Sequence, residues 1–596
     1  MCGIAGIIGE RPGQALEERL NALNGHLRHR GPDDAGLWIS PEGQAGLVHT
    51  RLSILDLSAS GHQPMTSPDG RLVITFNGEI FNFRELREEL EREGVVFRSH
   101  SDTEVLLHLY QRHGAAMLPK LRGMFAFCIW DECERSAFLA RDPLGIKPLY
   151  HSSRADGSLV FASELKALRC AGLVSSGIDP AALTAYFETG SVPEPLTLLQ
   201  GARCLEAGHW LRWQGGKIEK TCCYWKPRFE AGTALADDAS GAVRDALLDS
   251  VRHHFVSDVP VGIFLSGGID STALVALARE TGVRDLETFS IGVDDARLDE
   301  SSVAKATAGI FGTRHHEFRL DDEAAEAAFS EFLQCGDQPS IDGFNTFIVS
   351  RFARQRGVKV VLSGLGGDEL FGGYPSFVQV PRLARLNRML HAVPGLAPFI
   401  GSQMEHRGTS PRARRLGGML LRPPGMVGAY RAFRSVFSPR IARLLAARIA
   451  PEAAAMRADF DACPLEAHNE LDQVSELEIT RYMRNQLLKD SDVMSMAHGL
   501  ELRVPFVDSH LFEKAARIPA SQRLRPGKKM LLEAVPEIPA QVAAAPKRGF
   551  VFPFEKWLQG SRGGEFTRVT ASLPARNPTW YQRWCVFVLE RWLEQG

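Results

Sequence analysis

A cysteine at the second position of the chain is the first residue whose chemistry needs explaining. Once the initiator methionine is removed, Cys2 would carry a thiol and a free α-amine on one residue. An α-amine has a pKa of roughly 8, so part of it is unprotonated near neutral pH and can accept the thiol proton. A cysteine at this position is more often incidental, so the residues around it must decide.

Four polar segments follow Cys2 in the N-terminal part of the chain, and glycines flank it at positions 3, 6 and 9. The segments are residues 28–34, 49–53, 76–79 and 101–104. Together they supply an arginine for a carboxylate, an aspartate for an ammonium group, and an asparagine with backbone donors for an oxyanion. These are the groups needed to hold an amino acid and to open its amide.

A second candidate site begins where the apolar run 259–265 leads into the sequence Ser-Gly-Gly-Ile-Asp-Ser at residues 266–271. Glycines let backbone N–H groups approach an anion, and the start of the following helix adds partial positive charge. A simple turn with Asp270 or Ser271 as helix cap is the alternative. The strand before the turn and the helix after it favour a phosphate site, although the kinase-type motif G-x-x-x-x-G-K-[ST] is absent from the sequence.

A second glycine-rich turn, residues 362–374, also follows an apolar run and carries Asp368 and Glu369. Carboxylate oxygens are the ligands Mg²⁺ needs when it bridges nucleotide phosphates, and we take Asp270 and Asp368 as candidates. A solvated turn carboxylate is the alternative. Two strand ends of one parallel sheet would place both turns at the same edge, where ligands bind in open α/β sheets.

The pattern of elements predicts two bodies of different architecture. Residues 1–213 read as short strands between glycine and proline turns, with helices near 83–93 and 102–112, which predicts sheets covered by helices. Residues 214–240 lose this pattern and read as a connector. Strands and helices alternate from residue 259 to residue 362, which predicts a parallel α/β sheet within 241–596, and the last part is mostly helical.

Composition favours a folded protein of more than one domain that works in the cytoplasm. The chain has 596 residues, 44% hydrophobic and 23% charged, and a formal net charge of −2. That balance gives no general attraction to nucleic acid or to an anionic membrane. The 10 cysteines lack paired C-x-x-C spacing, no window is apolar enough to span a bilayer, and the apolar opening lacks a basic leader.

Taken together and in this order, the motifs resemble the glutamine-hydrolysing asparagine synthetase family over nearly the whole chain. The resemblance implies an N-terminal-nucleophile glutaminase sandwich followed by a parallel-sheet α/β ATP-pyrophosphatase domain with a largely helical C-terminal part. It also implies glutamine, ATP, Mg²⁺ and a carboxylate acceptor as partners, with aspartate the leading candidate, and it suggests a homodimer.

The resemblance also assigns roles to individual residues. Cys2 would attack the glutamine amide, and Asn77 and Gly78 would stabilise the oxyanion. The residues holding the α-carboxylate and α-amine of glutamine would be Arg51, Glu79 and Asp102. The segment 122–126 looks like the family's stretch beside an ammonia tunnel, although a plain core strand explains it equally well.

In the second half the resemblance implies two groups of nucleotide-binding residues and one lysine. The nucleotide contacts would be Leu265, Ile291, Ser363 and Gly364, and the pyrophosphate loop would be Ser266, Gly267, Gly268, Asp270 and Ser271. Lys547 would stabilise charge on the transferring groups, whereas the residues alone indicate a surface lysine.

One departure concerns the acceptor. The family's second glycine-rich turn reads Ser-Gly-Glu-Gly, and this chain has Leu365 in place of the glutamate. That glutamate is a candidate general base for the attacking amine, and leucine cannot accept a proton. We therefore keep a second hypothesis, a carboxylate other than aspartate on a surface polysaccharide or secondary metabolite. A non-catalytic homologue is the third, and the retained Cys2 and loop 266–271 argue against it.

Overall fold

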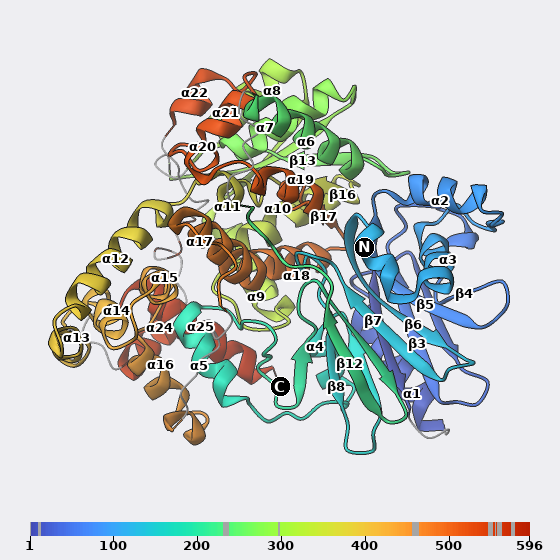
Figure 1. Ribbon diagram of the computed structural model, residues 1–596, viewed down its shortest axis with the longest axis horizontal. Helices are drawn as coiled ribbons and strands as arrows, with labels where there is room; N and C mark the ends of the chain where they lie inside the picture. Colours follow the sequence, from blue (N-terminus) through green and yellow to red (C-terminus); the bar gives the residue numbers. More distant parts are fainter. Residues whose placement is uncertain are drawn as a thin grey trace.

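The computed structural model describes residues 2–9, 14–230, 238–295, 299–455, 464–545, 552, 554, 556, 563–573 and 578–595. The N-terminal half, in blue and cyan, forms the layered sheets on one side of Figure 1, and the green to red segments lie beside and above it. Within the described residues no helix is long and apolar enough to cross a membrane.

Two six-stranded antiparallel sheets form the N-terminal half. The first has the order β10-β8-β9-β1-β3-β2, with β1 Gly3–Ile8, β2 Asp34–Ile39, β3 Ala45–Arg51, β8 Tyr150–Ser153, β9 Leu159–Ala162 and β10 Ala202–Cys204. The second has the order β12-β11-β7-β6-β5-β4, with β4 Met65–Thr66, β5 Leu72–Ile80, β6 Gly123–Asp131, β7 Ser136–Arg141, β11 His209–Gln214 and β12 Lys217–Cys223. The predicted sandwich is therefore present.

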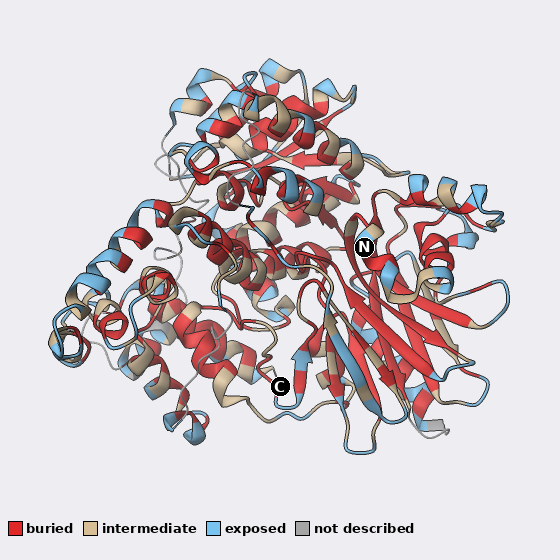
Figure 2. Ribbon diagram, in the orientation of Figure 1, coloured by how far each residue is buried: buried red, intermediate tan, exposed pale blue. Residues whose placement is uncertain are grey.

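Apolar side chains between the two sheets hold the sandwich together, and helices cover its outer faces. Ile4 and Leu47 of the first sheet share one buried cluster with Val73 and Cys128 of the second. The covering helices are α1 Gln14–Leu27, α4 Leu165–Cys170 and α5 Pro180–Thr189 on the first sheet and α2 Phe83–Arg92 and α3 Asp102–His113 on the second. In Figure 2 the strands are red along most of their length, as expected for covered sheets.

The strand β12 corrects the expected connector. It lies inside the segment 214–240 and pairs antiparallel with β11, so the second sheet continues to Cys223. Most of its residues are exposed or only partly buried. An edge strand of this kind lacks the apolar alternation that would have marked it in the sequence.

The second half contains a five-stranded parallel sheet of order β15-β14-β13-β16-β17. Its strands are β13 Val261–Phe264, β14 Glu287–Val293, β15 Arg314–Leu320, β16 Val360–Leu362 and β17 Glu501–Arg503. The helices that follow its strands are α7 Ile269–Glu280, α8 Ser301–Phe311, α9 Asp322–Cys335 and α10 Phe344–Gln355, and α6 Ala239–His254 precedes them. Because β13 and β16 are neighbours, both glycine-rich turns leave the sheet at one edge.

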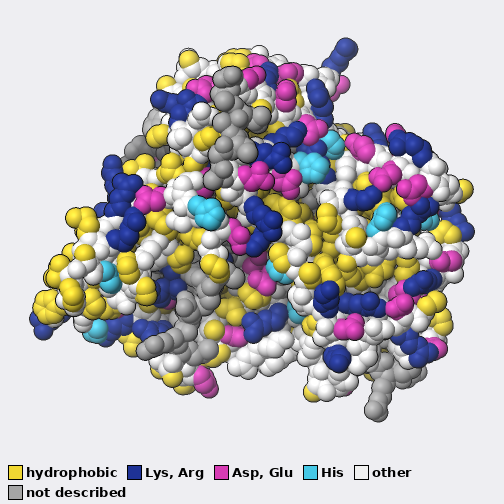
Figure 3. All heavy atoms as spheres, in the orientation of Figure 1, with side chains coloured by type: hydrophobic (Ala, Val, Ile, Leu, Met, Phe, Trp, Pro, Cys, Tyr) yellow, Lys and Arg dark blue, Asp and Glu magenta, His cyan; other side chains and the backbone are white. Residues whose placement is uncertain are grey.

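Helices make up most of the remaining chain. They are α11 Gly367–Phe371, α12 Ser376–His391, α13 Leu396–Arg407, α14 Pro411–Leu420, α15 Met426–Arg434, α16 Pro439–Ala446, α17 Glu470–Leu477, the π-helix η4 Glu478–Leu488, α18 Lys489–Met496, α19 Ser509–Ala516, α20 Ala520–Arg523, α21 Lys529–Ala534, α22 Ala540–Ala544, α24 Gly563–Ser572 and α25 Trp580–Glu594. On the face shown in Figure 3, Lys and Arg side chains are interspersed with Asp and Glu.

Candidate active sites

Cys2 lies directly before the strand β1, which pairs with β3 on one side and with β9 on the other. Its side chain is 8% exposed, and burial raises the pKa of its thiol. The backbone N–H of Cys2 donates to Oδ1 of Asn77 at 3.0 Å, and its carbonyl accepts from Nε of Arg30 at 3.1 Å. The position of residue 2 is therefore fixed by β5 of the second sheet and by the turn that follows α1.

Asn77 and Gly78 lie on β5, in the sheet that faces Cys2. The Nδ2 atom of Asn77 is buried and, within the described part of the chain, has no hydrogen-bond partner. Gly78 has a φ of +155°, and a Cβ there would stand 2.1 Å from the carbonyl oxygen of Met124. Glycine is thus required for β5 to pair with β6 beside Cys2, and Asn77 offers a donor for a developing oxyanion.

Two buried carboxyl groups, those of Glu79 and Asp102, lie next to Asn77 and Gly78. Burial and the nearby Glu501 raise the pKa of Glu79 well above its ordinary value, and burial raises the pKa of Asp102 to about 6. Asp102 accepts the backbone N–H of Ile80 at 3.0 Å. An ammonium group placed here would stabilise both carboxylates, so the pair suits an α-amine.

Arg51 has a structural task that the sequence did not suggest. Its guanidinium donates to the carbonyl oxygens of Ser58 at 3.0 Å and Leu55 at 3.2 Å, and also to that of Asp56. A Cβ on Gly61 would stand 2.0 Å from its Nη2 atom. Arg51 therefore braces the loop 55–61 at the end of β3, and a substrate carboxylate would share the guanidinium with these carbonyl groups.

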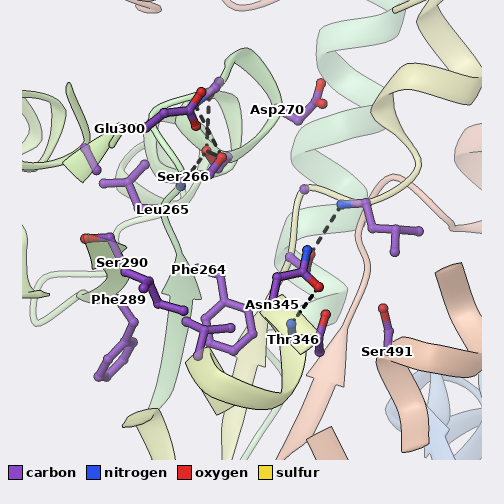
Figure 4. Close-up of a pocket in the computed structure, with 18 of the residues that line it drawn as sticks. Phe264, Leu265, Ser266, Asp270, Phe289, Ser290, Glu300, Asn345, Thr346 and Ser491 are labelled. Carbon is purple, nitrogen blue, oxygen red and sulfur yellow. Dashed lines mark hydrogen bonds between the residues drawn. The ribbon is translucent and has the colours of Figure 1, made fainter. Parts of the chain in front are cut away.

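A cavity of about 310 Å³ lies where the two glycine-rich turns meet. Its lining includes Leu265, Ser266, Gly268, Asp270, Ser271, Ile291, Ser363, Gly364 and Asp368, which are nearly all the nucleotide and metal candidates drawn from the sequence. Figure 4 shows this cavity, with Ser266 in the loop before the helix α7 and Asp270 in the first turn of that helix. Gly267 is not among the lining residues. Its φ of +76° is in the region that favours glycine, so it allows the chain to turn within the loop.

Glycines allow the two turns to come into contact. A Cβ on Gly364 would stand 2.8 Å from Cβ of Asp270, and one on Gly367 would stand 2.4 Å from its Oδ1 atom. Both positions must therefore lack a side chain for the loops to approach each other this closely. The result is that Asp270 and Asp368 face one point.

Lys528 occupies that point, and sequence reasoning missed it. Its ammonium group forms ion pairs with Asp270 and, at 2.6 Å, with Oδ1 of Asp368. Burial acts to lower the pKa of Lys528, but the two aspartates outweigh it and raise that pKa. Its separation of 258 residues from Asp270 leaves no spacing in the sequence that would mark the contact.

Asp270 and Asp368 also fit the predicted Mg²⁺. Both residues line the cavity at the phosphate loop and carry the carboxylate oxygens that Mg²⁺ prefers, so they would hold the ion beside the phosphates and next to Lys528. In the described ranges no group of three or more His, Cys, Asp or Glu could hold a metal by itself. Glu369 does not join them, because it is buried and accepts a hydrogen bond from Tyr374 at 2.9 Å. Burial and then Asp368 raise its pKa to about 8.

Leu365 lines the same cavity and has no group that accepts a proton. Among the other lining residues, Asp490 of α18 is a buried carboxyl group that receives a hydrogen bond from Ser340 at 2.6 Å. Burial and the nearby Asp342 raise the pKa of Asp490 well above its ordinary value. Lys547, the remaining predicted catalytic residue, lies outside the described residues.

The helix α18 touches both candidate sites. Asp490 and Ser491 line the cavity, while the next residue, Asp492, pairs with Arg30 at 2.8 Å and with Lys147 at 3.3 Å. Arg30 and Lys147 are fully buried and belong to the N-terminal half. Since Arg30 also holds the carbonyl of Cys2, a single buried chain of contacts joins the two sites.

The segment 122–126, predicted to lie beside a tunnel or in a core, is at the boundary of the two halves. Arg122 pairs with Asp508 at 2.8 Å and with Asp249 at 2.7 Å, both in the second half. Met124 belongs to the apolar cluster that contains Leu265. The strand is thus buried and in contact with the body that carries the nucleotide cavity.

Comparison with known proteins finds a different family for each of two parts of the chain. Residues 1–225 match the glutamine amidotransferase domain family, and residues 242–581 match the asparagine synthase family. A Bacillus subtilis protein named asparagine synthetase [glutamine-hydrolyzing] 1 is 35% identical over 94% of this chain and 88% of its own length. The chain belongs to the glutamine-hydrolysing asparagine synthetase family.

Other relatives of this family member carry different names. A Gibberella zeae protein named Amidase chry2 is 28% identical over 94% of this chain and 90% of its own. Among solved structures, a glutamine phosphoribosylpyrophosphate amidotransferase from B. subtilis matches 61% of this chain and 81% of its own at 18% identity, with a TM-score of 0.30.

Proposed function

We propose that this chain releases ammonia from glutamine at Cys2 and transfers it to a carboxylate that it first activates with ATP. The observation that carries the proposal is that the helix α18 contributes to both sites. Its residues Asp490 and Ser491 line the nucleotide cavity, and its residue Asp492 pairs with Arg30, which contacts Cys2. A helix that contacts both sites suits two half-reactions that must occur together.

In the first half-reaction Cys2, freed of the preceding methionine, attacks the side-chain amide carbon of glutamine. The thiol proton passes by way of the α-amine to the departing nitrogen, ammonia leaves, and water later hydrolyses the glutamyl thioester. The Nδ2 atom of Asn77 and the backbone N–H of Gly78 stabilise the oxyanion, while Glu79 and Asp102 hold the α-amine. The Nδ2 of Asn77 supports this assignment, because it is buried and no residue that the structure describes forms a hydrogen bond with it.

In the second half-reaction an oxygen of the acceptor carboxylate attacks the α-phosphorus of ATP and displaces pyrophosphate. The backbone of residues 266–268 and the start of α7 hold the phosphates, and Lys528 neutralises part of their charge. Asp270 and Asp368 would hold Mg²⁺, which would supply further positive charge to the phosphates. Ammonia then attacks the acyl carbon and AMP leaves. Adenylation is needed because AMP is a far better leaving group than hydroxide, and a closed route keeps ammonia away from water.

Aspartate is the first candidate acceptor, because relatives over most of the chain are named as asparagine synthetases. A different carboxylate is the second, and Leu365 favours it, since the family's candidate base is missing from the lining of the cavity. The relative named as an amidase is in keeping with a family that includes other acceptors.

Isotope exchange between ATP and pyrophosphate tests the second half-reaction directly. We expect exchange that depends on an added carboxylic acid and that falls at least tenfold in Asp270→Asn, because the variant loses one of two carboxylates at the phosphate site. Exchange that needs no acid, or that is unchanged in Asp270→Asn, would contradict the proposed adenylation site.

A further inference from the structure

A second cavity adjoins the nucleotide cavity, and the half-reactions described above leave it without a role. Its volume is about 850 Å³, compared with about 310 Å³ for the nucleotide cavity. Asp342, Asn345, Asp368 and Leu487 line both cavities, so a ligand in one would reach the other. The walls of the second cavity come mainly from α10, η4, α14, α15 and α25.

The size of this cavity argues against a small amino acid as its occupant. Cavities of ~300–1,000 Å³ hold molecules of the size of a typical drug and bury most of their surface. Aspartate would fill a small part of this cavity and leave the remainder to water. The volume next to the adenylation site therefore suits an acid that carries rings.

The wall formed by η4 and the turn after α11 offers flat surfaces to such rings. Tyr374 and Tyr482 are edge to face, with centroids 6.0 Å apart. The guanidinium of Arg434 lies 3.7 Å from the ring centroid of Tyr482 and 4.7 Å from that of Tyr374. Glu478 fixes Arg434 at 2.7 Å, so these three side chains form a rigid platform.

Arg415 adds a positive charge for which the described ranges offer no counter-ion. Its Nη1 atom donates to the carbonyl oxygen of Ser435, its buried Nε atom has no partner, and among the described residues no carboxylate lies within ion-pair distance. Burial and the neighbouring Arg412 lower its pKa. Two other arginines of the cavity are paired, Arg431 with Glu188 and Arg434 with Glu478. A half-buried guanidinium in this state favours an anionic ligand.

We propose that the acceptor is a ring-bearing acid with a second anionic group. Its reacting carboxylate lies at the junction near Asn345 and Asp368, its ring packs against Tyr374 and Tyr482, and its second anion binds Arg415. This inference rests on the proposed function and specifies its substrate. Two sources share the chemistry, an oligosaccharide of uronic acids and an aromatic dicarboxylic acid.

Acid-dependent exchange between ATP and pyrophosphate separates these acceptors. The probes are digalacturonate, its monomethyl ester, biphenyl dicarboxylate and aspartate, each with the wild-type chain and with Arg415→Gln. We expect faster exchange with at least one ring-bearing diacid than with aspartate, and a KM for that diacid about tenfold or more higher in Arg415→Gln. The KM for ATP and glutaminase activity should not change, and Arg412→Gln, an exposed neighbour on the same helix, should resemble the wild type.

The monomethyl ester tests the second anion, because it retains the rings and one carboxylate. Where digalacturonate is the better substrate, Arg415→Gln should leave the KM of the ester unchanged. Faster exchange with aspartate, no exchange with either diacid, or an equal KM in Arg415→Gln and the wild type would overturn the inference. Glutamine hydrolysis without exchange for any acid, aspartate included, would instead refute the proposed synthetase reaction.

Discussion

Lys528 provides the sharpest test of the nucleotide site, because its position is costly for the fold and useful for the reaction. Its φ is +55°, in the left-handed region, which costs a non-glycine residue ~1–2 kcal/mol. Its ammonium is buried between Asp270 and Asp368. We infer that the chain tolerates this strain in order to hold a positive charge where pyrophosphate leaves.

We predict that Lys528→Met lowers the rate of acid-dependent exchange between ATP and pyrophosphate at least a hundredfold. Loss of one preorganised donor to developing charge costs ~2.7–4 kcal/mol of transition-state stabilisation, which corresponds to ~10²–10³ in rate. Lys528→Gly removes the same charge and relieves the backbone strain, so its melting temperature should exceed that of Lys528→Met. Lys529→Met is the matched control, because Lys529 is the exposed neighbour.

Two results would refute this reasoning. Exchange in Lys528→Met within about twofold of the Lys529→Met control would show that the ammonium does not act on the phosphates. Equal loss of exchange and of glutaminase activity measured without ATP would show that the variant damages the fold, because Cys2 and its neighbours do not contact Lys528.

Three further predictions concern the glutaminase half and its contact with α18. Gly78→Ala should abolish glutaminase activity, since the added Cβ would stand 2.1 Å from a carbonyl of β6, while acid-dependent exchange continues. Asp492→Leu should lower stability by ~3–5 kcal/mol in thermal unfolding, because buried Lys147 loses its ion-pair partner among the described residues and buried Arg30 keeps only Glu164, and a shift below 1 °C would contradict this. Burial acts to raise the pKa of Glu164, but His29 and Arg30 outweigh it and lower that pKa from 4.5 to about 2. The ionised carboxylate therefore stabilises the fold by up to ~3 kcal/mol above pH ~4.5, and this stabilisation is lost as the pH falls toward ~2. The melting temperature of Glu164→Gln should accordingly vary less with pH over this range than that of the wild type.

The sequence was sufficient for the elements whose signal is local. Both glycine-rich turns, the strands before them and the helix after residue 268 were predicted, because alternating apolar runs and glycines report directly on backbone conformation. The strand β17 was missed because Glu501 and Arg503 are charged, yet both are buried and paired with each other. Rules that place charged residues at the surface fail wherever tertiary contacts supply the counter-ion.

Long-range contacts account for the other omissions. Lys528 meets Asp270 across 258 residues, and the second cavity is assembled from helices of which none has a motif of its own. Arg51 was predicted to bind a substrate, but its contacts with the loop after β3 depend on how that loop folds back. Such groupings follow from packing, which the order of residues does not reveal.

The central claim is that ammonia made at Cys2 is consumed in the nucleotide cavity of the same molecule. Cys2→Ala tests it most directly when amide formation on the adenylated acid is measured with glutamine and, separately, with ammonium chloride. We predict complete loss of the glutamine-dependent reaction and an ammonium-dependent rate close to that of the wild type. Glutamine-dependent amide formation that persists in Cys2→Ala, or a wild-type chain that is fully active with its methionine retained, would contradict the account.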